Sequence, residues 1–186
     1  MGVVDILFNP NGRIRASEFW RGVIILIGLG VITQVAALYG PPALAIASLL
    51  VQLVMIYMYV CVFGKRLHDS GKTAWLSILF FIGIFVLSFI GQSVFFPFIE
   101  GYSELQAEMT AEIEANGFNF EIMAAYGERV AELTAWPSLI LNVVAGLIGS
   151  FFCAQLWSDP YPNKYGDPVG GYVEPEDEDD FLLNPN

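Results

Sequence analysis

Long apolar runs alternate with short polar segments along this chain of 186 residues. Four of the runs are long enough to cross a lipid bilayer as helices, and they cover residues 22–39, 42–63, 74–98 and 136–157. About 20 helical residues, each rising about 1.5 Å, cover the hydrocarbon core of a membrane. The pattern therefore predicts an all-α membrane protein with a bundle of four transmembrane helices. A hydrophobic content of 55% and a mean hydropathy of +0.58 agree with this class.

The same pattern divides the chain into three parts. We expect residues 1–21 to form an interfacial segment, residues 22–157 to form the membrane domain, and residues 158–186 to form a tail. The polar stretch Gly64–Trp75 predicts a short hairpin loop between the second and third helices. Trp136-Pro137 predicts the start of the fourth helix, because proline is tolerated in a first helical turn.

Small residues on the fourth predicted helix recur at four-residue spacing, at Ala145, Gly149 and Cys153. Small side chains at this spacing let helix backbones approach closely in lipid. We expect this face to pack within the bundle. An interface between two copies of the chain is the less favoured alternative.

Basic residues fall almost entirely on one side of the four-helix arrangement, and only Arg129 lies on the other. An excess of lysine and arginine marks the cytoplasmic side of a membrane protein. We therefore expect both termini in the cytoplasm. The residues on the basic side are Arg13, Arg15, Arg21, Lys65, Arg66, Lys72 and Lys164.

Acidic residues dominate two polar segments and give the chain a formal net charge of −11. Segment 99–135 carries apolar stripes beside its glutamates, which predicts a helical outer loop with an acidic solvent face. We favour a cap packed on the bundle over a binding site here. The run Glu176–Asp180 repels itself, so we expect the end of the tail to be disordered. Neither segment offers the basic stripe that nucleic acid requires, so we expect no nucleic-acid partner.

The stretch Gly64–Trp75 also holds three of the eight lysines and arginines and the only histidine. Its Ser70-Gly71-Lys72-Thr73 looks like the end of a phosphate-binding loop, but Arg66 stands where that pattern opens with glycine. Nucleotide binding is therefore excluded. His68 beside Asp69 lacks the nucleophile of a hydrolase and the further ligands of a metal site. We expect no catalytic residue, no cofactor and no metal, and favour a structural role in which Asp69 pairs with a nearby base.

Three motifs in this chain resemble those of a known family. They are Gly12-Arg13 with Arg15 and Phe19-Trp20, then Arg66-Leu67-His68-Asp69-x-Gly71-Lys72-x-x-Trp75, and last Asn163-x-Tyr165-Gly166-x-Pro168. In this order they resemble the bacterial inner-membrane family of domain of unknown function 805 (DUF805), over residues 8–168. The long acidic loop and the acidic tail depart from the family's compact pattern. The resemblance implies a multi-pass protein of the bacterial inner (plasma) membrane and, since the family has no assigned activity, it implies no reaction.

The three motifs share one membrane face in this topology, so packing of the helices is expected to bring them together. A basic cluster at the inner interface suits an anionic lipid headgroup or a small anion. In the slightly favoured alternative, these charges only fix the topology and tie the loops. The candidate binding residues are Arg13, Arg15, Arg66, His68, Asp69, Lys72 and Asn163.

Two classes of function remain open from the sequence. The first is a non-enzymatic membrane protein that binds anionic lipid, a membrane-protein partner or a second copy of itself. The second is a small transporter or transporter subunit, with Gln34, Gln52 and Asn142 along a polar path. Amides inside membrane helices also serve as hydrogen-bonding contacts between helices. No charged residue lies deep in any run, which argues against an ion pathway. An enzyme ranks third.

Overall fold

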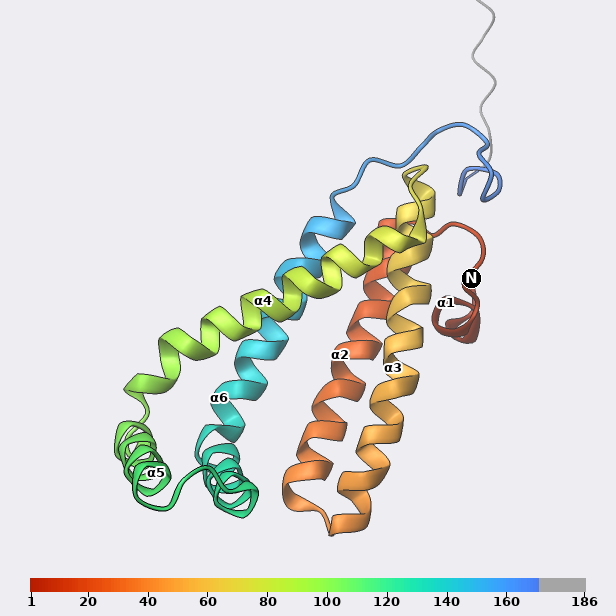
Figure 1. Cartoon of the computed structure of the whole chain (residues 1–186). Helices are drawn as coiled ribbons and strands as arrows, with labels where there is room; N and C mark the ends of the chain where they lie inside the picture. The colour runs from red at the N-terminus through yellow and green to blue at the C-terminus, as the bar shows by residue number, and fades with distance from the viewer. Residues whose placement is uncertain (171–186) are drawn as a thin grey trace, which may run out of the picture.

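A computed structural model describes residues 1–170 of the chain, apart from the side chains of Pro42 and Ala45. The predicted disorder at the end of the tail falls on residues outside this range. Helices make up the fold of the described residues, and Figure 1 shows their arrangement. They are α1 (Val3–Phe8), α2 (Ala16–Tyr39), α3 (Pro42–Asp69), the 3-10 helix η1 (Ala74–Leu76), α4 (Ser77–Phe95), the 3-10 helix η2 (Phe96–Phe98), α5 (Tyr102–Asn116) and α6 (Phe120–Ala154).

Four stretches of helix are long and apolar enough to cross a membrane. They are Ala16–Tyr39, Ile46–Asp69, Ala74–Phe98 and Phe120–Ala154. This confirms the prediction of an all-α protein with four membrane-span helices. The direction in which the helices cross the membrane stays a prediction.

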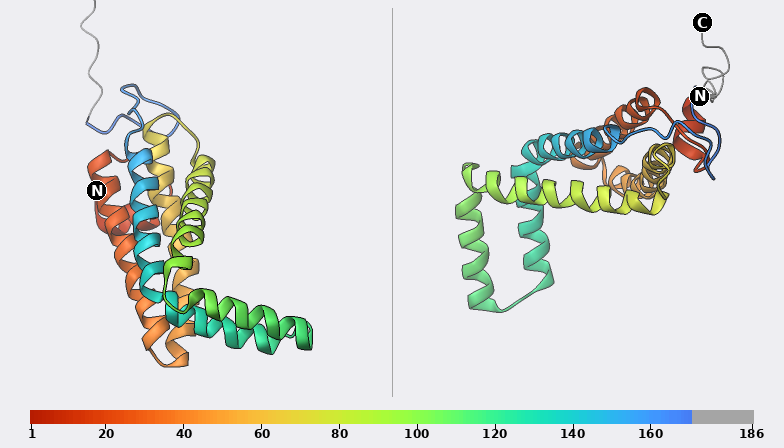
Figure 2. Two further views of the ribbon diagram at one scale, coloured as in Figure 1. Left: turned by 90° about the vertical axis from the view of Figure 1, so that its left-hand side faces the viewer. Right: turned by 90° about the horizontal axis from the view of Figure 1, so that it is seen from above.

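The long helices form two pairs, α2 with α3 and α4 with α6 (Figure 1). We call the end where residues 1–21, 64–76 and 155–170 gather the charged end, and the end with the α2–α3 turn the far end. The pairs meet at the charged end, and α4 leans away from α3 toward the far end (Figures 1 and 2).

Helix α3 is longer than the sequence pattern indicated. It continues to Asp69, so the predicted hairpin loop shrinks to a tight turn before η1. Gly71 ends the helix in the left-handed region at φ +69°, where glycine has no Cβ to clash. The Gly71 N–H donates to His68 O at 3.0 Å and the Lys72 N–H to Leu67 O at 2.9 Å. This is a Schellman ending, and it places Lys65, Arg66, His68 and Asp69 on a helix.

Helix α6 also corrects the predicted boundaries, because it begins at Phe120 and not at Trp136. The Asn119 side chain caps its first turn by accepting from the Glu121 N–H at 2.9 Å. Pro137 lies inside the helix, where it removes one backbone hydrogen bond and favours a kink. The first turns of α6 run beside α5 as an arm that leaves the bundle (Figure 2). The position of this arm outside the membrane stays a prediction.

The hydrophobic core lies at the charged end, where the two helix pairs meet. Phe19 is at its centre and contacts the Phe63 ring edge-on, with 5.0 Å between ring centroids. Burial of this apolar surface fixes the charged end as the best-packed part of the bundle. The buried cluster comprises Ile6, Leu7, Ile14, Phe19, Val23, Leu26, Met58, Val62, Phe63, Cys153 and Ala154.

Close helix approach within each pair depends on glycine. A Cβ at Gly22 would lie 2.9 Å from both γ-carbons of Val62, and one at Gly149 would lie 2.2 Å from Cγ1 of Ile84. Ala145 and Cys153 of the same α6 face are 2% and 0% exposed. The prediction that this face packs within the bundle is therefore confirmed.

Candidate functional site

Asp69 is the centre of the charged end. Asp69 is 1% exposed, and the side chains of two arginines contact its carboxylate. Arg13 donates from Nε to Oδ1 at 3.2 Å, and Arg66 donates from Nη1 to Oδ2 at 2.6 Å. The Ser158 hydroxyl also donates to Oδ2, at 2.6 Å. The structure thus brings together one carboxylate and two guanidinium groups out of solvent, and two positive charges share one negative charge.

The other N–H groups of the two arginines hold the segment that follows α6. Arg13 donates from Nη1 to Tyr161 O at 2.9 Å and to Gly166 O at 3.3 Å, and from Nη2 to Asp159 O. Arg66 donates from Nη2 to Ala154 O at 2.9 Å and to Leu156 O. The two side chains therefore fasten residues 154–166 to the end of α3.

His68 and Asn163 complete this attachment. Asn163 donates from Nδ2 to His68 O and to Asp159 Oδ2, each at 3.2 Å. The Tyr165 ring stacks on the His68 ring with centroids 3.7 Å apart and an interplanar angle of 9°. His68 Nδ1 lies 3.2 Å from Gly12 O, and the tautomer with a proton on Nδ1 donates there. The three sequence motifs therefore meet in one packed structure.

The carboxylate of Asp159, in the segment after α6, accepts hydrogen bonds that lower its pKa. The Tyr161 N–H and the Asn163 amide donate to its carboxylate, at 3.0 and 3.2 Å. These two contacts, with a smaller contribution from the charge of Arg13, hold the pKa of Asp159 below its usual value. The carboxylate is therefore ionised throughout the neutral range.

Two of the seven predicted site residues lie at the surface and outside this packed group. Arg15 is exposed, and its Nε donates to Val169 O at 2.8 Å. Lys72 is also exposed, and its ammonium makes no hydrogen bond or ion pair with the described part of the chain. The other five, Arg13, Arg66, His68, Asp69 and Asn163, are brought together. That any of the seven binds a headgroup stays a prediction.

Lys65 is a polar residue of this end that the sequence reasoning counted only for orientation. It is fully buried, and its Nζ donates to Asp5 O in the last turn of α1. The Tyr57 hydroxyl donates to Phe8 O at 2.9 Å and supports the same helix. The partner of Lys65 is a backbone carbonyl, which leaves no signal in the sequence, so the pattern could not have identified it.

A second candidate region is a cavity of about 610 Å³ between α2, α3, α4 and α6. Gln34, Gln52 and Asn142, which the sequence placed along a polar path, all line it. Ser88 and Gln92 of α4 also line it, and the sequence reasoning had not assigned them to this path. An amide or hydroxyl within an apolar run is the pattern that could have identified them.

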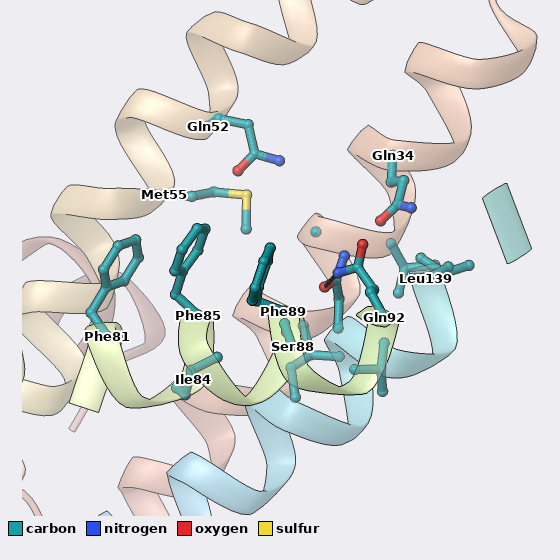
Figure 3. A pocket seen from close by; sticks show the side chains of 15 residues that line it. Gln34, Gln52, Met55, Phe81, Ile84, Phe85, Ser88, Phe89, Gln92 and Leu139 are labelled. Atoms are coloured by element: carbon teal, nitrogen blue, oxygen red, sulfur yellow. Dashed lines mark hydrogen bonds between the residues drawn. The ribbon is translucent and has the colours of Figure 1, made fainter. Parts of the chain in front are cut away.

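Hydrogen bonds satisfy the amides of this cavity only in part. Gln92 donates from Nε2 to Asn142 Oδ1, and Gln52 donates from Nε2 to Thr33 Oγ1, both at a long 3.4 Å. Gln34 has no hydrogen-bond partner within residues 1–170. Figure 3 shows Gln34 and Gln92 near one another at one end of the cavity.

The apolar wall of the cavity is formed mainly by α4. Phe81, Phe85 and Phe89 stand in a row along it, and Met55 of α3 lies opposite (Figure 3). No charged residue is among the cavity-lining residues of the described chain. The region combines an amide-rich end with an uncharged hydrocarbon wall.

The α5–α6 arm carries a separate group of charges. Arg129 donates from Nη2 to Glu108 at 2.9 Å, and the Tyr126 hydroxyl donates to Glu112 at 3.2 Å. Both partners of the ion pair are more than half exposed. Solvent screens exposed pairs of this kind, so they join the two helices of the arm weakly.

Comparison with known proteins places the chain by family. No curated protein and no solved structure matches it at a significant level. A family model described as "Protein of unknown function (DUF805)" matches residues 7–167. The matched range contains the four long helices and the three motifs that meet around Asp69, apart from Pro168 at the end of the third. The chain belongs to the DUF805 family.

Proposed function

We propose that this chain is a non-enzymatic protein of the bacterial inner membrane, with both termini in the cytoplasm and a charged end that binds anionic lipid headgroups. One observation carries the proposal. Residues 1–21, 64–76 and 155–170, which make up the charged end, hold seven lysines and arginines against five acids, so this end keeps a surplus of positive charge. The exposed bases Arg15 and Lys72 are among the seven.

The four lysines and arginines of the predicted site fall into a buried pair and an exposed pair. Arg13 and Arg66 are buried and donate mainly to Asp69 and to backbone carbonyls, so they hold the structure of the charged end. Arg15 and Lys72 are exposed and have donors to offer a phosphate. A basic residue near an anionic membrane surface contributes about 1 kcal/mol. Headgroup contact is therefore assigned to Arg15 and Lys72.

Native mass spectrometry of protein extracted in a mild detergent tests this proposal. The combined variant Arg15→Gln and Lys72→Gln should bind phosphatidylglycerol about thirtyfold more weakly than the wild type, because two charges of about 1 kcal/mol each are lost. Arg129→Gln removes one exposed charge on the arm and serves as the matched control. Equal phosphatidylglycerol retention in all three proteins would overturn the proposal.

The same spectra report on the other partners that this end suits, a membrane protein or a second copy of the chain. A dimer mass that survives delipidation would favour self-association over headgroup binding. A monomer with bound phosphatidylglycerol supports the lipid proposal.

The cavity supports a second candidate function, that of a small transporter or transporter subunit. The observation in its favour is that Gln34, Gln52 and Asn142 come together on the walls of one cavity. Its test is transfer of an uncharged fluorescent lipid between leaflets of proteoliposomes, measured by quenching from outside. Transfer no faster than in protein-free liposomes would remove this candidate.

A further inference from the structure

We propose that the cavity between α2, α3, α4 and α6 binds one neutral lipid, with its hydroxyl-bearing head among Gln34, Gln92 and Asn142 and its hydrocarbon chain along Phe81, Phe85 and Phe89. The site goes beyond the headgroup proposal, which concerns the opposite end of the bundle. It rests on the transporter candidate only in using the same cavity, and it names the class of ligand that this cavity would bind.

The depth of the amides suits a lipid head. Gln34 lies five residues before the end of α2 at Tyr39, which is about 8 Å along the helix axis. The Gln52–Thr33 hydrogen bond sets Gln52 at nearly the same level, since Thr33 directly precedes Gln34. Gln92 is near the end of α4. The polar groups therefore form one layer, a short way inside the far end of the bundle.

Unfilled hydrogen-bonding capacity in this layer calls for a ligand. A side-chain amide carries two donors and an acceptor oxygen with two lone pairs. Gln34 uses none of these within the described chain. Gln52 has one long contact, to Thr33, and Gln92 has one to Asn142, both at 3.4 Å. Polar groups left unpaired at membrane depth are costly. A hydroxyl at the cavity mouth both donates and accepts, and an ester oxygen beside it accepts, so the two together satisfy several amides.

The charge of the walls selects a neutral molecule. The lining residues contain amides, one serine and apolar side chains, with no acid, base or histidine among them in the described chain. An ionised headgroup in such surroundings would lack a counter-charge. Phosphatidylglycerol is therefore disfavoured here, whereas a diacylglycerol or a lipid alcohol is accommodated.

Size and wall chemistry select a lipid over a protein helix. A volume of about 610 Å³ falls within the usual range for small-molecule sites, about 300–1,000 Å³. Three turns of a helix about 10 Å across fill more than about 1,000 Å³ and would have to enter as one rigid body, whereas a lipid places only its head and one chain in the cavity. The row of Phe81, Phe85 and Phe89 extends from the amide layer toward the charged end. That wall offers a hydrocarbon chain one continuous apolar surface.

Photocrosslinking to the purified full-length protein tests the proposal. The probe is a diacylglycerol with a photoreactive group in one acyl chain, and the modified residues are mapped by mass spectrometry. Crosslinks should concentrate at Met55, Phe85 and Phe89, and unlabelled diacylglycerol should compete for them. Equal labelling of Ile24 and Leu49, which are exposed on α2 and α3 and do not line the cavity, would overturn the proposal, as would equal competition by phosphatidylglycerol.

Amide variants sharpen the test. The combined variant Gln34→Leu and Asn142→Leu keeps the side-chain size and should lower the probe affinity about tenfold. Gln106→Leu is the matched control, because Gln106 lies on the α5 arm and donates only to Tyr102 Oη at 3.0 Å. All variants must elute as monodisperse protein, and variants with aggregated profiles are replaced by Gln34→Leu alone. Unchanged affinity in the amide variant would overturn the proposal.

The outcome is separable from that of the other proposals. Arg15→Gln with Lys72→Gln should leave diacylglycerol crosslinking unchanged, because those residues lie at the charged end. Crosslinking that persists in a protein that moves no lipid between leaflets supports the binding site and removes the transporter candidate. Crosslinking that falls together with phosphatidylglycerol retention in the Arg15 and Lys72 variant would overturn a separate neutral site.

Discussion

At the charged end of the bundle, polar groups are buried and meet their partners at short range, as when Arg66 donates to Asp69 at 2.6 Å. At the far end, the amides of Gln92 and Asn142 meet at 3.4 Å and stay partly exposed. Helix α3 takes part at both ends, with Asp69 at the first and Gln52 at the second. Charge-assisted contacts close the bundle at the first end, whereas long amide contacts border a cavity at the other.

The largest effect should come from labelling the two ends across a membrane. The basic asymmetry predicts that Ser70→Cys, at the charged end, faces the cytoplasm and that Glu108→Cys, on the arm, faces the outside. An impermeant thiol reagent on intact cells should label only Glu108→Cys. The native Cys61 and Cys153 are buried, so the wild type supplies the background. Labelling of Ser70→Cys alone would show that the predicted orientation is wrong and that the charged end faces the outside.

Removal of the central carboxylate should be the most destabilising single change. Asp69→Asn leaves two buried guanidinium groups without a counter-charge, and breaking a buried pair costs about 3–5 kcal/mol. The free energy of unfolding in mild detergent should fall by that amount. Asp167→Asn changes an exposed acid at the same end and should cost far less. Similar losses in the two variants would show that the buried cluster is not what closes this end.

A smaller loss should follow from Gly71→Ala. The backbone at Gly71 has φ +69°, and left-handed geometry costs a residue with a Cβ about 1–2 kcal/mol. Thermal unfolding should shift downward accordingly. Gly28→Ala in α2 is the control, because a Cβ there meets nothing within 4 Å. If the two variants unfold at the same temperature, the turn after α3 does not contribute to the closed end.

The smallest effect should be a pH dependence at Asp159. Its pKa is lowered in the folded protein, so its contribution to stability is complete above the unfolded value of about 3.9 and is lost as pH falls through the folded value. Hydrogen exchange of residues 155–170 should accelerate in that acidic range. Asp159→Asn should lose this acid-dependent step, and an unchanged profile would assign the step to another group.

The sequence predicted the four membrane helices because bilayer thickness sets their length. It misplaced two helix ends for physical reasons. Polar residues at a membrane boundary continue a helix until a glycine ends it, as at Gly71, and an interior proline kinks a helix without ending it, as at Pro137. Boundaries therefore depend on backbone geometry that hydropathy does not record.

The sequence predicted which residues belong to the candidate site better than it predicted how they are arranged. The order of the three motifs placed Arg13, Asp69 and Asn163 at one end. The pattern could not tell that Arg13 is buried and Arg15 exposed, because that depends on partners more than 140 positions away. Backbone carbonyls carry no sequence information, so the acceptors at Leu156 and Tyr161 were not readable either. Amides in apolar runs did identify three of the cavity-lining residues.

The attachment of the segment after α6 sets an order of events during biosynthesis. The backbone partners of Arg13 at Asp159, Tyr161 and Gly166 follow it by 146, 148 and 153 positions. A ribosome adding about 5–20 residues per second needs roughly ten to thirty seconds to make that stretch. Throughout this interval the nascent Arg13 lacks these three acceptors, although Asp69, its carboxylate partner, follows it by only 56 positions. A ribosome that stops before Asp159 therefore releases a chain whose membrane helices are complete but in which Arg13 cannot form its hydrogen bonds to the segment after α6.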